Sequence, residues 1–128
     1  MKFKVVEVAD CAIYRGKVYT YSVTVETVAG EIKFSETTSI TPEDEGKTLE
    51  MEVEKFGTII EKVTDPKGII NVEGDHQEFE GTLKEISEKE FTAEIDGLEL
   101  VVEKLDSNED WSEYEKGDTV RFSTSFYP

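Results

Sequence analysis

Alternation of apolar and polar side chains is the feature that most constrains how this chain can fold. Between residues 91 and 96, Phe91, Ala93 and Ile95 alternate with three polar residues, and four other stretches follow the same period of two. Such a period buries one face of a β-strand and leaves the other in water. No window of helix length has a comparable period of 3.6, so the pattern predicts an all-β protein. The expected strands lie near residues 2–10, 17–27, 31–37, 48–55, 58–63, 69–73, 78–86, 90–96, 98–104 and 119–127.

Turn residues separate these stretches. Asp96-Gly97 stands between two alternating runs and is a strong signal for a β-hairpin. The cluster Asp65-Pro66-Lys67-Gly68 indicates a turn near the middle of the chain. We therefore expect two small units, residues 1–64 and 65–128, which either stand apart or form one compact domain over residues 1–128.

One phrase occurs twice in the sequence. "TPEDEGKTLEMEV" covers residues 41–53 and "SEYEKGDTVRFST" covers residues 112–124. Each copy begins with Thr or Ser, which are good N-cap residues, and carries an acid three positions later. Gly46 and Gly117 then occupy the place of a left-handed helix stop. Each copy thus predicts one short helical turn, a glycine corner and a strand.

The order strand, hairpin, loop with a helical turn, strand resembles small closed β-barrels, including the OB-fold and SH3-like barrels. The resemblance rests on "DEGKTLEM" and "EKGDTVRF". It implies two related barrel-like units of antiparallel strands and an internal duplication. A chance likeness between two strand starts is the alternative explanation.

Acidic residues dominate the charge of the chain. It carries 30 Asp and Glu against 14 Lys and Arg, for a formal net charge of −16. Residues 65–128 hold 18 of the acids and 6 of the bases, which gives 6 − 18 = −12 for that half. A field of this sign repels phosphate backbones and anionic membranes and favours solubility and basic protein partners. A solvated surface with no binding role is the simpler interpretation.

The leading functional hypothesis is a non-enzymatic binding or accessory module that engages a protein, possibly a basic one, through its acidic surface. Aromatic residues within a charged rim are common interface anchors. In the acidic second half we expect Trp111, Tyr114 and Tyr127 to fill this role. Alternatively, Trp111 folds back over its own loop as a lid.

A second hypothesis is single-stranded nucleic-acid binding by the first unit, as in OB-folds, where aromatic residues stack on bases beside cations. The candidate residues are Tyr14, Arg15, Lys17 and Tyr19. Alternating tyrosines also form ordinary cross-strand pairs, which is the structural explanation. Exposed edge strands could in addition pair two copies of the chain.

Catalytic and metal chemistry find little support. The single Cys11 and the single His76 are too few for a zinc site, and we expect no cofactor and no metal. Asp106, Asn108 and Asp110 have the spacing that begins a calcium loop, but Gly and Glu are missing from its later positions. A small enzyme with a site made of carboxylates is the third hypothesis. The sequence contains no signal peptide and no membrane span, and we expect a soluble, cytoplasmic protein.

Overall fold

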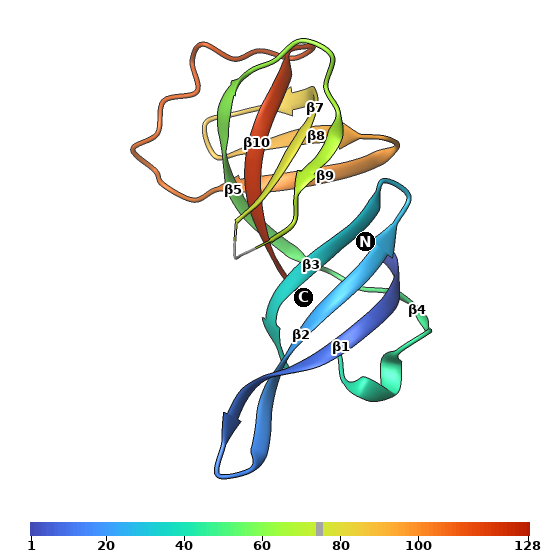
Figure 1. The fold of residues 1–128 in the computed structure, drawn as a ribbon. Helices are drawn as coiled ribbons and strands as arrows, with labels where there is room; N and C mark the ends of the chain where they lie inside the picture. Colours follow the sequence, from blue (N-terminus) through green and yellow to red (C-terminus); the bar gives the residue numbers. More distant parts are fainter. Residues whose placement is uncertain (74–75) are drawn as a thin grey trace. The chain divides into compact units, whose positions relative to one another are not determined.

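The structure, a computed structural model, describes residues 1–73 and 76–128. Within them the chain forms ten β-strands and one 3-10 helix (Figure 1). The all-β prediction is confirmed, and the strands form a closed five-stranded barrel and a curled four-stranded sheet. The elements are β1 (Lys2–Tyr14), β2 (Lys17–Thr27), β3 (Gly30–Thr37), η1 (Pro42–Asp44), β4 (Thr48–Glu50), β5 (Glu54–Lys62), β6 (Gly68–Asn71), β7 (Gln77–Ile86), β8 (Glu90–Ile95), β9 (Leu98–Lys104) and β10 (Thr119–Tyr127).

The chain divides into two compact units. Unit 1 holds Met1–Glu54 together with Phe126–Pro128, and unit 2 holds Lys55–Ser125. The division falls between Glu54 and Lys55, earlier than the expected 64/65, because β5 pairs with β9 and β10 of the barrel. Hydrophobic periodicity identifies a strand but not the sheet that it joins, so the sequence pattern could not place this boundary.

Unit 1 is built on a four-stranded antiparallel sheet in the order β3-β2-β1-β4. Its core is apolar, and the rings of Phe3 and Phe34 meet edge to face with their centroids 5.0 Å apart. Phe126, from the end of β10, packs its ring 6.0 Å from that of Phe34. Strands β1 and β2 continue together past the ends of β3 and β4 as a two-stranded ribbon (Figure 1).

Unit 2 contains the closed barrel, in which the strands follow the order β10-β5-β9-β8-β7 and β10 returns to pair with β7. Strand β5 runs parallel to β9, while β7, β8 and β9 form an antiparallel meander. Strand β6 pairs with β7 outside this ring. The ring of Phe122 lies 5.5 Å from that of Phe79 and 5.3 Å from that of Phe91, so three strands share one aromatic core.

The two glycine corners make the same pair of backbone hydrogen bonds. The Gly46 N–H donates to the carbonyl of Val5, whose own N–H donates to the residue after the glycine. In unit 2 the Gly117 N–H donates to the carbonyl of Leu83 in the same way, and the Leu83 N–H donates to the residue after that glycine. Both glycines have a positive φ, which explains why glycine stands at each corner.

The helical turn expected before each corner forms only once in the described part of the chain. Pro42, Glu43 and Asp44 form 3-10 helix η1, and the Asp44 carboxylate accepts the N–H of Thr41 at 3.0 Å. The second copy forms hydrogen-bonded turns instead. It lacks the proline, and the Asp118 carboxylate takes the Glu115 N–H at 2.9 Å, which gives that segment a different local partner.

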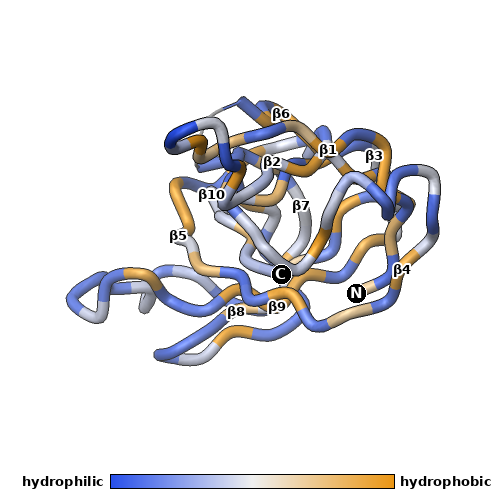
Figure 2. The backbone as a smooth tube through the Cα atoms, turned by 90° about the horizontal axis from the view of Figure 1, so that it is seen from below, coloured by the Kyte–Doolittle hydropathy of each residue, from blue (hydrophilic) through white to orange (hydrophobic). Residues whose placement is uncertain are grey.

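Hydrophobic and hydrophilic stretches alternate along the chain trace, as the sequence pattern requires (Figure 2). Strand β8 illustrates the rule, since Phe91, Ala93 and Ile95 are buried and the residues between them are not. No helix in residues 1–73 or 76–128 is long and apolar enough to cross a membrane.

Candidate functional site

The hairpin of β8 and β9 has a register that its turn fixes. Asp96 and Gly97 both have positive φ, the geometry of a two-residue type I′ turn. Ile95 therefore lies opposite Leu98, and every later pair follows in step without a bulge. This regular register decides which side chains stand next to one another on the outside of the barrel.

The outer face of this hairpin is acidic around a small apolar centre, and we call it the acidic face. Glu90 lies opposite Glu103, and Glu94 lies opposite Glu99. Between these pairs, Thr92 lies opposite Val101, whose side chain is 44% exposed. The acidic face consists of Glu90, Thr92, Glu94, Glu99, Val101 and Glu103.

Like charges directly opposite each other in a sheet are unfavourable, by a few tenths of a kcal/mol per pair or more. Only part of this repulsion is relieved within the barrel. Lys84 on β7 forms an ion pair with Glu94 at 3.2 Å. Among the residues that the structure describes, Glu90 and Glu99 form no ion pair, and both are exposed.

The charge of Glu103 on the acidic face also acts on Lys55 of β5. Burial lowers the pKa of the Lys55 ammonium from 10.5, and the charge of Glu103 acts in the opposite direction and raises it. Glu103 thus already has a half-buried cation on the neighbouring strand within reach of its charge. A cation brought from outside would meet the same attraction without the burial that opposes it.

An open depression of about 480 Å³ adjoins one end of the acidic face. Glu90 and Glu103 line it together with Ser87, Lys89 and Lys104. Lys104 is already engaged, because its Nζ donates to the Glu109 carbonyl at 2.7 Å and lies 4.6 Å from the centre of the Trp111 ring. A side chain entering here would meet the two glutamates next to one available ammonium group, that of Lys89, which is exposed.

Trp111 belongs to the core of the barrel. Its side chain is 5% exposed, and its ring packs edge to face on Phe91 with the centroids 5.3 Å apart. This is the lid arrangement, and it leaves the ring little surface for a partner. The Trp111 Nε1 and the Glu109 Oε2 are buried without a hydrogen-bond partner in the described part of the chain, while the other oxygen of Glu109 accepts from the Thr58 hydroxyl.

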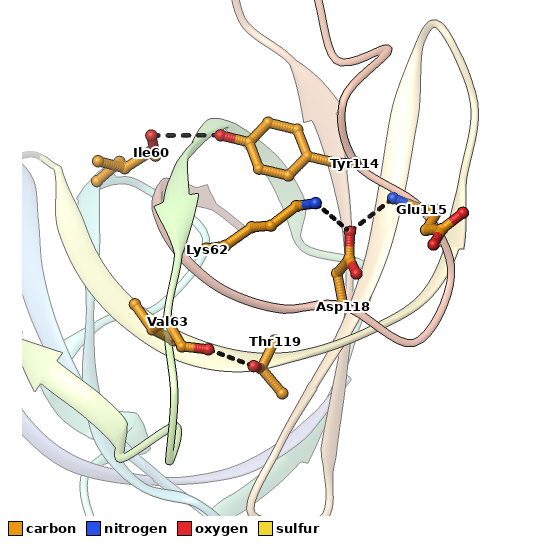
Figure 3. A network of polar contacts seen from close by, with 7 residues as sticks. All are labelled: Ile60, Lys62, Val63, Tyr114, Glu115, Asp118 and Thr119. Carbon is orange, nitrogen blue, oxygen red and sulfur yellow. Dashed lines mark hydrogen bonds and ion pairs between the residues drawn. The ribbon is translucent and has the colours of Figure 1, made fainter.

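Tyr114 lies in the loop between β9 and β10, which side chains tie to the end of β5 (Figure 3). The Tyr114 hydroxyl donates to the Ile60 carbonyl at 3.4 Å, and Lys62 pairs with Asp118 at 3.5 Å. Burial raises the pKa of Tyr114 above its ordinary value. Tyr127 is 43% exposed at the end of β10, among the residues of unit 1. The three aromatic residues expected at one surface therefore divide between a core position, a loop anchor and an exposed strand end.

The four residues proposed to bind nucleic acid do come together, at the tip of the β1–β2 hairpin. Tyr14, Arg15, Lys17 and Tyr19 are all exposed. The Arg15 guanidinium lies 5.2 Å from the centre of the Tyr14 ring, and the Lys17 ammonium lies 5.3 Å from that of Tyr19. The structure thus presents two cation–π pairs on a projecting ribbon.

The polar residues of the loop after β9 are engaged in local turns. Asp106 accepts the N–H of Asn108, and Asp110 accepts the N–H of Ser112, both at 2.9 Å. The second bond lowers the pKa of the Asp110 carboxyl. Each of these contacts uses one oxygen, Oδ1, of its carboxylate.

Two residues with reactive side chains lie elsewhere. The His76 Nδ1 lies 3.2 Å from the Ser125 Oγ, a contact that the sequence pattern did not predict. Ser125 is 2% exposed. Cys11 is exposed on β1 with its Sγ 3.4 Å from a Glu36 oxygen, although the apolar stretch around it in the sequence favours a buried position.

Sequence reasoning missed the acidic face although its signal was present. The Asp96-Gly97 turn predicts the hairpin, and a two-residue turn makes the pairs 94–99, 92–101 and 90–103 inevitable.

Comparison of the chain with protein-family models, with curated proteins and with solved structures finds no match.

Proposed function

We propose that this protein is a non-enzymatic binding module that engages a cationic segment of a protein on its acidic face. The proposal rests on two pairs of facing glutamates on the exposed side of one hairpin. Glu90 faces Glu103, and Glu94 faces Glu99. Arrangements that break a local rule of stability occur preferentially at functional sites. A lysine or arginine placed between two facing carboxylates gains attraction from both.

The spacing of the face describes the ligand. Along β8, Glu90 and Glu94 are four residues apart, which is about 13 Å in an extended strand. Thr92 and Val101 lie midway between the two glutamate pairs. An extended segment with the pattern cation, any residue, apolar residue, any residue, cation places its three inward side chains over these three positions, since its own period is also two.

Phosphate-bearing partners fit this face poorly. The four glutamates would repel a nucleic-acid backbone, whose binding depends on neutralisation by Lys and Arg. In the barrel, the Lys84 ammonium is already paired with Glu94. The charge of the face therefore favours a protein partner on unit 2. The alternative, single-stranded nucleic-acid binding through Tyr14, Arg15, Lys17 and Tyr19, concerns unit 1.

The matching glycine corners support an internal duplication behind this arrangement. Val5 and Leu83 hold equivalent places in two copies of one hydrogen-bond pattern. The five-stranded ring, with one parallel pair, is also compatible with an OB-like barrel. In this proposal the two units began alike, and the acidic face developed in the second one.

Binding of a peptide tests the proposal. The probe is a fluorescent peptide with the repeat Arg-Thr-Val-Thr-Arg, and its anisotropy is measured against the wild-type chain and the variant Glu99→Gln/Glu103→Gln. We expect the variant to bind about tenfold more weakly or worse, a loss of roughly 1.4 kcal/mol. Glu99→Gln alone should unfold at an equal or higher urea concentration, because Glu99 has no ion pair within residues 1–73 and 76–128 and loses only its repulsion with Glu94, whereas Glu103 also attracts Lys55.

The matched control is Glu43→Gln/Glu52→Gln, which removes two exposed carboxylates from unit 1. It changes the net charge by the same amount, and we expect its affinity to stay within about twofold of wild type. An equal loss in both variants would mean that the peptide responds only to the overall charge. That result, or the absence of any binding at low salt, refutes the proposal.

A further inference from the structure

The ribbon at the tip of β1 and β2 is the least covered part of unit 1. Strand β3 pairs with β2 only from Tyr21 onward, and β4 pairs with β1 only over Lys2–Lys4. Residues 12–20, which we call the arm, therefore form a two-stranded ribbon with no third strand, and none of them is buried. A ribbon of two strands is marginally stable on its own in water.

The arm carries apolar surface and positive charge together. Ile13 is 58% exposed, Tyr14 is 61% exposed and Tyr19 is 49% exposed. Arg15 and Lys17 are its only charged residues, so the arm holds +2 while the rest of the chain holds −16 − 2 = −18. Exposed apolar side chains rimmed by charge mark a surface that docks on another molecule.

We propose that the arm docks on the acidic face of a second copy of this chain. The two surfaces carry charges of opposite sign, two cations at the tip of the arm and four carboxylates on the acidic face. On one face of the arm Lys17 lies opposite Tyr14 and its ammonium packs on Tyr19, whereas Ile13 pairs with Val18 on the other face. The acidic face instead has Val101 between its two glutamate pairs. This inference rests on the proposed function, but the ligand that it names is the cationic tip of a hairpin, with Arg15 and Lys17 on either side of Gly16, and not an extended segment with cations four residues apart.

The contact is heterologous, because two different surfaces of the chain meet. A copy that has inserted its arm still offers its own acidic face to another arm. Such contacts build rings or open chains of copies rather than a closed two-fold dimer. The assembly therefore grows with protein concentration.

Charge reversal tests the inference by sedimentation velocity over a range of protein concentrations. Two variants, Arg15→Glu/Lys17→Glu and Glu99→Lys/Glu103→Lys, each place like charges at the contact. We expect the self-association constant of each to fall by more than about tenfold. The chain that carries all four substitutions restores opposite charges and should associate again.

Net charge separates this result from general repulsion. The face variant has −16 + 4 = −12 and the arm variant has −16 − 4 = −20, while the fourfold variant returns to −16. If overall repulsion governed association, the face variant would associate more strongly than wild type. We expect the opposite. Circular dichroism spectra of each variant serve as the control that its strands are kept.

Three results would overturn the inference. The first is a wild-type chain that stays monomeric at all concentrations, and the second is a face variant that associates as well as wild type. The third is a monomeric chain whose arm binds a labelled single-stranded oligonucleotide and loses it on Arg15→Glu/Lys17→Glu. A monomeric chain that still binds the arginine peptide on its acidic face would refute only this inference and leave the proposed function standing.

Discussion

Trp111 shows at the level of one residue how a loop without periodicity can still supply the core. Its ring covers Phe91 from the segment between β9 and β10, and Lys104 covers the ring in turn. Hydrophobic periodicity cannot reveal such a position. A loop side chain is buried where the loop happens to pass over the core, and its sequence neighbours follow no repeat. The sequence therefore left its two roles, anchor and lid, open.

Replacement of Trp111 tests its place in the core. Trp111→Ala leaves a large cavity, and we expect a loss of about 3–5 kcal/mol in the free energy of unfolding. Trp111→Phe keeps an aromatic contact with Phe91 and should lose much less. Urea unfolding of both variants is followed by circular dichroism. Tryptophan fluorescence cannot be used, because both variants lack the only tryptophan of the sequence. An Ala variant of unchanged stability with weakened peptide binding would show that Trp111 is an interface anchor after all.

The raised pKa of Tyr114 predicts that the stability of the fold decreases at alkaline pH. Burial, followed by the charges of nearby glutamates, raises its pKa above 10.0 in the folded chain. Between pH 10 and the raised value the unfolded chain loses this proton and the folded chain keeps it, so the stabilisation falls as pH rises through this window.

The phenylalanine variant isolates this contribution. We expect Tyr114→Phe to lose less stability than wild type between about pH 9 and 11, since the other tyrosines titrate alike in both proteins. Urea midpoints at several pH values give the two slopes. Parallel slopes would show that the hydroxyl is as accessible in the folded chain as in the unfolded one.

Among the elements, the β8–β9 hairpin was the easiest to predict and the β1–β2 arm the hardest. The Asp96-Gly97 turn fixes the first, including its cross-strand pairs. The expected first strand ended near residue 10, because "CAIYR" breaks the alternation, whereas β1 runs on to Tyr14. Outside the core neither face of a ribbon is buried, so the pattern that identifies a strand is lost.

Strand β5 closes the barrel through a residue that has no side chain. A Cβ built on Gly57 would lie 1.9 Å from the backbone oxygen of Ser123 on β10. We therefore expect Gly57→Ala to destabilise unit 2 by about 3 kcal/mol or more, because backbone atoms of both strands must move.

The control for this close approach is Gly46→Ala. Gly46 has φ +84 with nothing within 4 Å of a built Cβ, so the variant carries only the conformational penalty of about 1–2 kcal/mol. Urea unfolding compares the two, and hydrogen exchange should show faster opening of β5 in Gly57→Ala. Equal losses would mean that the barrel tolerates a wider separation of β5 and β10.

At the scale of the whole molecule, each unit contains the same glycine corner, and the two units differ in the surfaces that they expose. Unit 1 carries the arm with Arg15 and Lys17, and unit 2 carries the acidic face around Val101. The strong negative charge of the second half was evident in the sequence. Its concentration into facing pairs follows from the Asp96-Gly97 turn, although the charge count alone does not reveal it.

The central claim is that cationic protein segments bind on the outer face of β8 and β9. The most direct measurement is an amide chemical-shift map of the ¹⁵N-labelled chain during titration with the arginine peptide. The account predicts that the largest changes fall on Glu90–Ile95 and Leu98–Lys104. Changes centred on the arm or spread evenly over acidic loops would contradict it.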